Sequence, residues 1–563
     1  MKKLLSLILC VLMGVSLFSA GAMALELPDL SVLEDVVEAV EEAAEEASVA
    51  GSEAPVAVEA DETAPVLASG GAVAIEEANF PDEKFRSHVA YYDKDGDTIL
   101  SADELAAVKE ISCQYRDIES LKGIEHFVNL ERLNCNDNEL TELDLSVLPN
   151  LKQLECCYNQ LTELDLTVVP NLTYLHCWSN EIKELDFSKC PNLYWVQAHD
   201  NQIETIDVSV VPLLKTLNLG RNLLTEIDVS ALPLLEDFYC YENEISNLDV
   251  SKNPNLELLN CDETLLTELN VSANTKLQSL DCSKCLLTEL DLQANVELEV
   301  LGCSNNSISE LKLPQSEKMW YLYVYSNKLT ELDVSGCPKL YSINCNENPL
   351  TELDVSKHTQ LQTLEVANTG LTKLDVTANA KLGTLTIENT EITSLDLSGN
   401  PELNMLNCAK TPLGKLDMSN NPKISDLSCY GMPNLSGLDI QNQPNLLVAY
   451  AGNNPYDGKD AEGVPFVSYS GMSDDYSLWG SMKLDPEMEL LTAPLTDAEI
   501  LDTNGDGKFG PEDMVHLMKD VVGTDSVKIG RGDANKDGTV DILDVIRLAC
   551  YLSEEAAREE AQN

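Results

Sequence analysis

A repeat of 21 residues occupies most of this 563-residue chain and leaves few folds open to it. From Leu130 the sequence can be written in consecutive lines, such as LERLNCNDNELTELDLSVLPN and LKQLECCYNQLTELDLTVVPN. Lines begin every 21 residues up to Ile424, one residue is inserted before Leu446, and an irregular unit begins at Val108. One line has too few apolar residues to form its own core, so neighbouring lines must stack into an elongated array.

The apolar places of a line, numbered 1 to 21, predict its secondary structure. Places 1, 4 and 6 are apolar, which favours a short β-strand whose alternate side chains face inward. Places 11, 14 and 16 are also apolar and are expected to close the rear of each coil. With strands about 4.8 Å apart, fifteen lines predict a solenoid on the order of 70 Å long.

Two polar places recur along the array. Place 9 is Asn from Asn138 to Asn243 and again in three later lines. Stacked Asn side chains satisfy backbone groups where the chain leaves the strand, so we interpret this place as structural. Place 15 is mostly Asp, as at Asp144 and Asp333. An Asp at a turn bonds its own backbone two residues on, and a calcium ladder along the rear is the alternative.

Ten of the 17 cysteines occupy place 6, and Cys113 fills the matching place of the irregular unit. In-register neighbours on parallel strands lie about 4.8 Å apart, whereas the Cβ atoms of a disulfide lie about 3.8 Å apart. The same place accepts Ala198, Leu219 and Ile387. We therefore interpret Cys at place 6 as a small buried apolar residue.

The pattern L-x-x-L-x-C-x-x-N-x-L-T-E-L-D-L resembles bacterial leucine-rich repeats, close in length to the internalin type, over roughly residues 108–450. The resemblance implies an α/β-type, right-handed solenoid with a parallel β-sheet on its concave face and little helix.

Places 3, 5, 7 and 8 are predicted to point outward from the concave strands, where solenoids usually bind partners. Exposed aromatic side chains there favour a surface that binds a protein or a glycan, which the sequence does not separate. The alternative is cross-strand packing that only stiffens the sheet. The candidate ligand-binding residues are Tyr158, Tyr174, Trp178, Trp195, Tyr239, Tyr241, Tyr321, Tyr323 and Tyr325.

A catalytic function has one candidate, a thiol hydrolase built on Cys157 with His176 or His199. Cys157 and His199 share place 7 two strands apart, about 10 Å, with Trp178 between them. A thiol and an imidazole must lie within hydrogen-bonding reach to cooperate, so we predict that the protein is not an enzyme.

A calcium-type loop, DKDGDTILSADE, precedes the array. Thr98 stands where such loops have Gly, which weakens the prediction because that place needs an unusual backbone turn. Residues 78–107 resemble the helical, EF-hand-like cap at the front of internalin-type arrays, with helices expected on both sides of the loop. Its calcium ligands would be Asp93, Asp95, Asp97, the carbonyl of Ile99, and Glu104.

Two further loops, DTNGDGKFGPED and DANKDGTVDILD, lie near the C-terminus, and each leads into an apolar helix. Residues 495–555 resemble a type I dockerin, which implies a helix pair folded by two Ca²⁺ ions that binds a cohesin domain of a scaffolding protein. The predicted ligands are Asp502, Asn504, Asp506, Lys508 and Asp513 in the first loop and Asp533, Asn535, Asp537, Thr539 and Asp544 in the second. The resemblance assigns cohesin choice to Pro511 and Glu512 and to Ile542 and Leu543, which differ between the halves.

The remaining segments and the net charge indicate where the protein acts and which partners it does not bind. Residues 1–24 have the pattern of a secretory signal, 25–77 of an acidic, mostly disordered linker, 451–494 of a closing β-cap with a linker, and 556–563 of a tail. A formal net charge of -60 disfavours nucleic acid, and no other apolar run is long enough to enter a membrane. We expect a monomer.

These features predict a secreted, non-catalytic recognition protein. Its concave face would bind a protein or glycan, and its dockerin would attach it to a cohesin-bearing scaffold of the cellulosome type that acts on polysaccharides. The alternative is an internalin-like adhesin held at the cell surface through cohesin.

Overall fold

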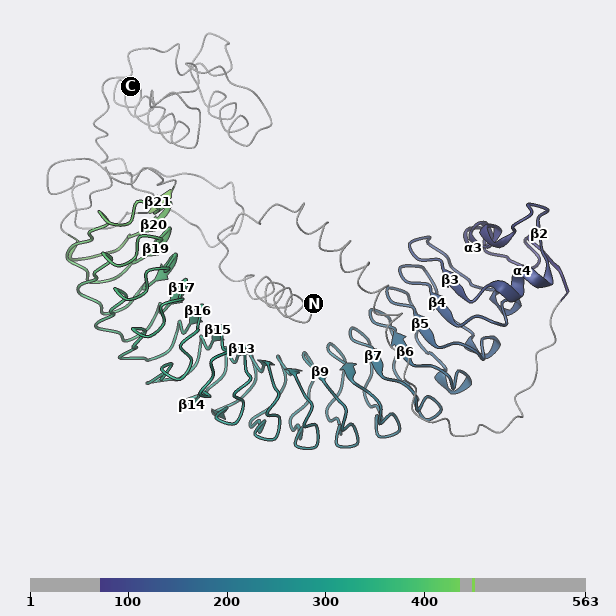
Figure 1. Cartoon of the computed structure of the whole chain (residues 1–563), viewed down its shortest axis with the longest axis horizontal. Helices are drawn as coiled ribbons and strands as arrows, with labels where there is room; N and C mark the ends of the chain where they lie inside the picture. The colour runs from purple at the N-terminus through teal and green to yellow at the C-terminus, as the bar shows by residue number, and fades with distance from the viewer. Residues whose placement is uncertain (1–70, 436–447, 451–563) are drawn as a thin grey trace, which may run out of the picture.

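The structure, a computed structural model, describes residues 71–435 and the backbone of residues 448–450. These residues form an arc of stacked coils with the strands on its inner side (Figure 1). The predicted signal, the closing segment and the dockerin, with every ligand predicted in the two C-terminal loops, lie outside the described residues. None of the described helices is long and apolar enough to cross a bilayer.

A parallel sheet of seventeen described strands lines the concave face. Each strand covers places 3 to 5 of its line, and each residue pairs with the residue at the same place in the next line, as Leu133 does with Leu154. This in-register pairing confirms the strand predicted from the apolar places and the leucine-rich-repeat solenoid with little helix. The strands are β3 (Glu110–Ser112), β4 (Arg132–Asn134), β5 (Gln153–Glu155), β6 (Tyr174–His176), β7 (Trp195–Gln197), β8 (Thr216–Asn218), β9 (Asp237–Tyr239), β10 (Leu258–Asn260), β11 (Ser279–Asp281), β13 (Val300–Gly302), β15 (Tyr321–Tyr323), β16 (Ser342–Asn344), β17 (Thr363–Glu365), β18 (Thr384–Thr386), β19 (Met405–Asn407), β20 (Asp426–Ser428) and β21 (Val448–Tyr450).

The rear of the coils has little regular structure. The 3₁₀ turns η3 (Ile124–His126), η4 (Leu145–Val147) and η5 (Leu166–Val168) close the first lines, and β12 (Glu289–Asp291) pairs with β14 (Glu310–Lys312) midway. The Asp at place 15 accepts a hydrogen bond from the backbone two residues on, at 3.0 Å for Asp144. This confirms the turn interpretation of place 15. Within residues 71–435, no three of these carboxylates gather as metal ligands would.

The Asn at place 9 joins consecutive lines, as predicted. Asn201 donates to the carbonyls of Cys177 in the preceding line and of Ala198 in its own, at 3.0 and 3.2 Å. Its Oδ1 accepts from the backbone N–H of Ile182, at 3.0 Å. These side chains are buried except for Asn306, which is partly exposed, so they satisfy backbone groups that the sheet leaves unpaired and that water cannot reach.

A second Asn ladder, at place 19, runs along the rear and was not predicted. Asn274 donates to the carbonyls of Val250 and Asn253 in the preceding line, at 3.0 and 2.9 Å. The same geometry recurs at Asn253, Asn295, Asn379, Asn400 and Asn421, all of them fully buried. Later lines therefore close with amide hydrogen bonds where the earlier lines use apolar residues such as Leu148.

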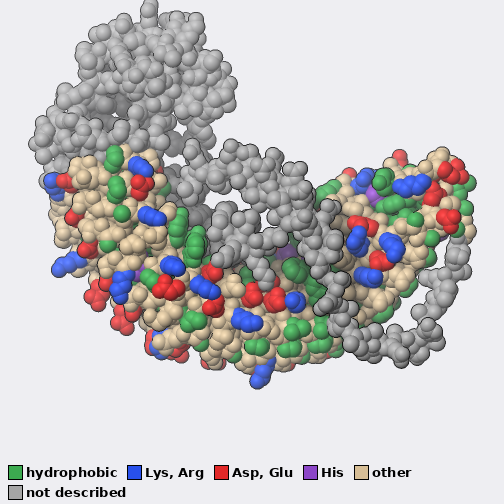
Figure 2. Space-filling model, viewed as in Figure 1, with side chains coloured by type: hydrophobic (Ala, Val, Ile, Leu, Met, Phe, Trp, Pro, Cys, Tyr) green, Lys and Arg blue, Asp and Glu red, His purple; other side chains and the backbone are tan. Residues whose placement is uncertain are grey.

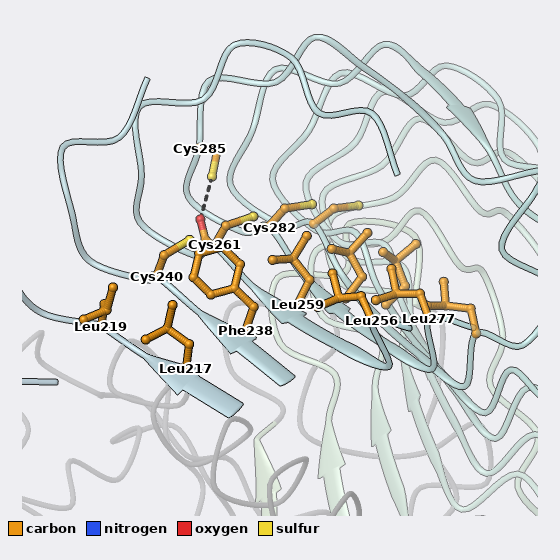
Figure 3. Close-up of a cluster of buried hydrophobic side chains, with 14 of the residues drawn as sticks. Leu217, Leu219, Phe238, Cys240, Leu256, Leu259, Cys261, Leu277, Cys282 and Cys285 are labelled. Carbon is orange, nitrogen blue, oxygen red and sulfur yellow. Dashed lines mark hydrogen bonds between the residues drawn. The ribbon is translucent and has the colours of Figure 1, made fainter. Parts of the chain in front are cut away.

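Buried Leu, Ile, Val and Cys side chains fill the space between the two faces as one continuous core. Figure 3 shows the place-6 cysteines of successive lines in a row beside the strand leucines, among them Cys240, Cys261 and Cys282. All fifteen cysteines of the described part are free and buried. Burial holds the pKa of Cys282 well above the ordinary thiol value, so the place-6 cysteines act as small apolar core residues.

A helical segment packs on the first unit. It comprises β1 (Val73–Ala74), α3 (Glu83–Val89), η2 (Ala90–Tyr92), β2 (Ile99–Leu100) and α4 (Ala102–Ala107), with β1 antiparallel to β2. Its residues Phe80, Phe85 and Leu105 belong to the core of the array. Because β1 lies within residues 25–77 and pairs with β2, the linker ends earlier than the sequence predicted.

Ion pairs at place 2 link neighbouring lines along the flank, where acidic and basic side chains are interspersed (Figure 2). Glu131 contacts both Lys109 and Lys152, at 2.9 and 2.7 Å, and Lys215 contacts Glu236 at 2.9 Å. Exposed pairs of this kind contribute little individually, so the ladders and the core dominate stability.

We predict that Asn201→Ala lowers the free energy of unfolding by about 2–3 kcal/mol, because it leaves buried backbone groups of two lines without partners. Urea unfolding followed by circular dichroism measures this. Asn171→Ala is the matched control, since the Asn171 side chain makes one exposed hydrogen bond, to Pro149. Equal losses in both variants would contradict the role assigned to place 9.

Candidate functional site

The first cluster of the concave face is a stack of rings at places 7 and 8 of three consecutive lines. The rings of Trp178 and His199 are stacked at 4.8 Å, and Tyr158 meets Trp178 edge to face at 4.3 Å. Tyr158 is 52% exposed. It also has φ of +51°, the left-handed turn that ends each strand. The turn therefore presents this ring at the edge of the stack.

A second cluster lies beside it on β6 and β7. Trp195 donates from Nε1 to Nε2 of His176 at 3.0 Å, so the proton of the neutral His176 ring sits on Nδ1. Nδ1 then donates to the hydroxyl of Tyr174, 3.3 Å away. The rings of Tyr174 and Trp195 are stacked at 6.1 Å. We call the two clusters together the aromatic patch; its residues are Tyr158, Tyr174, His176, Trp178, Trp195 and His199.

Both histidines of the aromatic patch are held neutral. Burial lowers the pKa of His176 to about 4, with a further contribution from His199. Burial also lowers the pKa of His199 to about 4, against the opposing effect of Asp200. The indole N–H of Trp195 is already used within the patch. The aromatic patch therefore offers mainly uncharged ring faces to a ligand.

The remaining predicted aromatic residues form separate groups. Tyr241 lies against Gly220 of the preceding line, where a Cβ atom would come within 2.3 Å of its ring. Tyr321 stacks on Tyr323 at 6.2 Å and tilts against Tyr341 at 5.7 Å. Tyr239 and Tyr325 are partly exposed on the same face, in β9 and after β15. The structure therefore places all nine predicted residues on or beside the concave face, but brings only some of them together.

The Cys157 thiol has none of the features of a nucleophile. It is 1% exposed, and burial raises its pKa far above the ordinary thiol value. Trp178 occupies place 7 of the line between Cys157 and His199, and its ring stacks on that of His199 at 4.8 Å. A reactive cysteine needs a stabilised thiolate and access to substrate, and Cys157 has neither.

The predicted ligands of the N-terminal loop are only partly assembled. Oxygens of Asp93, Asp95 and Asp97 lie within 4.8 Å of one another, as a cation site requires. Glu104 instead caps α4 with Ser101 and accepts the N–H of Lys94 at 2.6 Å. Thr98 takes φ of +67°, the left-handed conformation expected of the missing Gly.

Two carboxylates on the concave face, Asp281 buried and Asp262 partly buried, were not predicted. Asp262 follows β10, and Asp281 ends β11 with 9% of its surface exposed. Burial and the nearby Asp281 raise the pKa of Asp262 to about 8. The sequence gives little indication of these two carboxylates. To predict them, one would need to know that Gly302 is a neighbour and in which direction each side chain points.

Comparison with known proteins agrees with this geometry. Residues 107–168 match the family model described as leucine-rich repeats in two copies. The solved functional domain of InlJ from Listeria monocytogenes, described as including a cysteine ladder, shares 32% identity, with 69% of this chain and 78% of that chain covered and a TM-score of 0.50. This chain belongs to the internalin-like leucine-rich-repeat family.

Other relatives extend the comparison. Internalin J of Listeria monocytogenes serotype 4b is 35% identical over 68 residues, a match that spans 12% of this chain and only 7% of the relative. YopM from Yersinia enterocolitica shares 26% identity, with 64% of this chain and 82% of that chain covered and a TM-score of 0.53. The relation to internalin-like proteins therefore rests on the repeats and their core.

We predict that the contribution of His176 and His199 to the free energy of unfolding falls as pH drops from 6.5 to about 4. In that window the unfolded chain binds protons at His176 and His199 that the folded chain rejects, at a cost of about 1–2 kcal/mol for each ring. Urea unfolding at several pH values measures this. The His176→Gln/His199→Gln variant is expected to show a shallower slope, and an unchanged slope would contradict the assignment.

Proposed function

We propose that this internalin-like protein is a secreted, non-catalytic recognition protein that binds a protein ligand through the aromatic patch. The carrying observation is the partly exposed ring stack of Tyr158, Trp178 and His199 on the concave sheet. Aromatic side chains dominate protein interfaces because they bury large areas with little loss of side-chain freedom. The relation to internalin-like proteins supports a protein ligand over a glycan.

The chemistry of the aromatic patch supports the same ligand class. Its histidines are uncharged at neutral pH, and the indole N–H of Trp195 is used internally. A surface that reads sugars needs free hydrogen-bonding groups for hydroxyls, in addition to ring faces. To bind, apolar and aromatic side chains of a protein ligand need only ring faces to pack against and the exclusion of water around the contact.

We also propose that calcium-bound residues 495–555 attach the protein to a cohesin-bearing surface or scaffold. This part of the proposal rests on the sequence alone, through the two loops that begin at Asp502 and Asp533. A segment of that size has little core, so metal binding would supply much of its folding free energy.

The N-terminal segment is proposed as a cap that shields the first coil from solvent. Asp82 caps α3 and also accepts the N–H of Glu119 at 2.8 Å, which links the segment to the first unit. Its loop has three carboxylates for a Ca²⁺ ion, Asp93, Asp95 and Asp97, and Glu104 would have to leave its capping position to complete a seven-oxygen site.

We predict that Trp178→Ala/Trp195→Ala weakens binding of a protein ligand at least tenfold. Peptides selected from a displayed random library against the full chain serve as probes, and calorimetry measures their dissociation constants. The expected loss of affinity follows because the two substitutions remove the ring faces that bury the largest area of the interface.

The matched control is Leu223→Ala/Leu265→Ala, which removes two exposed apolar side chains at place 10 of other lines and should leave affinity unchanged. Cellohexaose and xylohexaose are titrated in parallel by tryptophan fluorescence. The protein-ligand proposal would be overturned in favour of a glycan by two results together. A hexaose would bind saturably at the aromatic patch, and the Trp substitutions would not change the affinity for the peptides.

We predict that the full chain forms a calcium-dependent complex with a cohesin and that Asp502→Ala/Asp533→Ala abolishes it. Each substitution removes the first ligand of a loop, so the segment loses its metal and its fold. Calorimetry against a cohesin panel, with and without chelator, measures complex formation. Asp93→Ala/Asp95→Ala is the control and should leave the complex intact; no capture by any cohesin would remove the attachment proposal.

A further inference from the structure

A patch of carboxyl and hydroxyl groups lies on the concave face between the tyrosine lines of β9 and β15. We call it the carboxylate patch, and its residues are Asp262, Asp281, Ser283, Gly302 and Ser304. Ser283 and Ser304 occupy place 7 of lines whose place 5 is Asp281 or Gly302. All five residues belong to three consecutive lines, so their strands are direct neighbours in the sheet.

The backbone of the neighbouring strand makes room for the Asp281 carboxylate. Asp281 Oδ1 accepts the N–H of Ser283 at 3.0 Å. The same carboxylate lies against Gly302, where a Cβ atom would come within 2.9 Å of Oδ1. Gly302 is the only glycine at place 5 of the array. Any larger residue at that place would displace the carboxylate.

Two polar groups of the carboxylate patch have no hydrogen-bond partner. Oδ1 of Asp262 is buried and unpaired. The hydroxyl of Ser304 is also unpaired, in a residue that is 1% exposed and adjoins the Asp281 line. The backbone N–H of Ser304 bonds the Ser283 hydroxyl at 3.2 Å, which fixes the two serines side by side. Buried polar atoms without partners cost free energy, so this arrangement is unfavourable unless something binds to it.

Within residues 71–435 neither carboxylate forms an ion pair, although Lys284 acts on both and lowers their pKa values. The Nζ of Lys284 pairs instead with Glu263. Burial and then Asp281 raise the pKa of Asp262 to about 8, and burial raises the pKa of Asp281. The hydroxyl of Tyr325 lies in the same electrostatic neighbourhood.

We propose that the carboxylate patch binds a cationic side chain of the protein ligand, a lysine ammonium or an arginine guanidinium, between Asp262 and Asp281. The unpaired Asp262 oxygen and Ser304 hydroxyl supply acceptors that such a donor group satisfies. The inference rests on the proposed function, because it specifies a second contact on the same face.

The position of the carboxylate patch sets the spacing that the ligand must match. Trp178 and Asp262 occupy place 7 of lines that are four repeats apart, which corresponds to about 19 Å along the sheet. The ligand therefore carries an apolar or aromatic anchor and a basic residue about 20 Å apart. When the basic group binds, the proton on Asp262 leaves to solvent and the carboxylate charge is compensated by the cation.

Hexalysine is the probe, titrated into the full chain by calorimetry at 150 mM salt, with hexa-acetyl-lysine as the neutral counterpart. Asp262→Asn/Asp281→Asn is expected to weaken hexalysine binding about tenfold. Glu268→Gln/Glu289→Gln removes the same number of carboxyl groups, from exposed rear positions of the same two lines, and is expected to change hexalysine affinity less than twofold. This control separates the carboxylate patch from the general attraction of an acidic chain for a polycation.

Proton release gives a second readout. At pH 7, titrations in buffers of different ionisation enthalpy should show proton release from the wild type and none from Asp262→Asn. The other groups that face Asp262 are Asp281, Glu263, Lys284, Cys285 and Tyr325. Release that persists in Asp262→Asn would assign it to one of these groups and overturn the proposal.

Gly302→Ala provides a variant without any change of charge. Its added methyl group would press on the Asp281 carboxylate, so weaker hexalysine binding is expected in a folded variant, as checked by circular dichroism. Equal hexalysine affinities for the wild type, Gly302→Ala and the Asp→Asn variant would overturn the carboxylate patch. Such equal affinities would not contradict the proposed function of the aromatic patch, because the selected peptides test that patch in a separate experiment.

Discussion

The buried amide at place 9 is the interaction on which the rest of the array depends. Asn201 bonds its own line and the preceding one at once, through both ends of its amide. A change of one residue in line length would move that side chain away from its partners. The ladder therefore enforces the 21-residue period, and the period in turn places every strand in register with the next. The concave face is a consequence of this register.

The turn after each strand holds the backbone in an unfavourable conformation, and the Asn ladder at place 9 offsets the free-energy cost. Place 8 takes a left-handed conformation in line after line, and most of the residues there are not Gly, for example Asp137, Arg221 and Glu242, with φ of +55°, +52° and +49°. Such a conformation costs on the order of 1 kcal/mol for each L-residue. The hydrogen bonds of the adjacent buried Asn hold this turn in place. One result concerns the aromatic patch, since the same turn brings Tyr158 beside Trp178.

The sequence predicted the parts of this structure that repeat. The strand at places 3 to 5, the Asn at place 9 and the Asp turn at place 15 each recur often enough to show their spacing. The rear ladder at place 19 escaped prediction because Asn appears there only in later lines, and Val211, Leu232 and His358 occupy it elsewhere. Single residues are harder still to predict. The bond from Trp195 to His176 and the fit of Asp281 over Gly302 depend on side-chain directions between adjacent lines.

A solenoid can accommodate costly residues on its binding face because its stability is distributed along its length. Each line contacts only its neighbours, so an unfavourable group in one line weakens two interfaces and leaves the others intact. Asp262 is unfavourable in this sense: between pH 4 and 8 the folded state retains a proton that the unfolded state gives up, so stability falls as pH rises. A compact core would transmit such a loss to the whole domain. In this chain the loss falls on the two interfaces that the line of Asp262 makes, with the lines of β9 and β11, and the aromatic patch lies outside them.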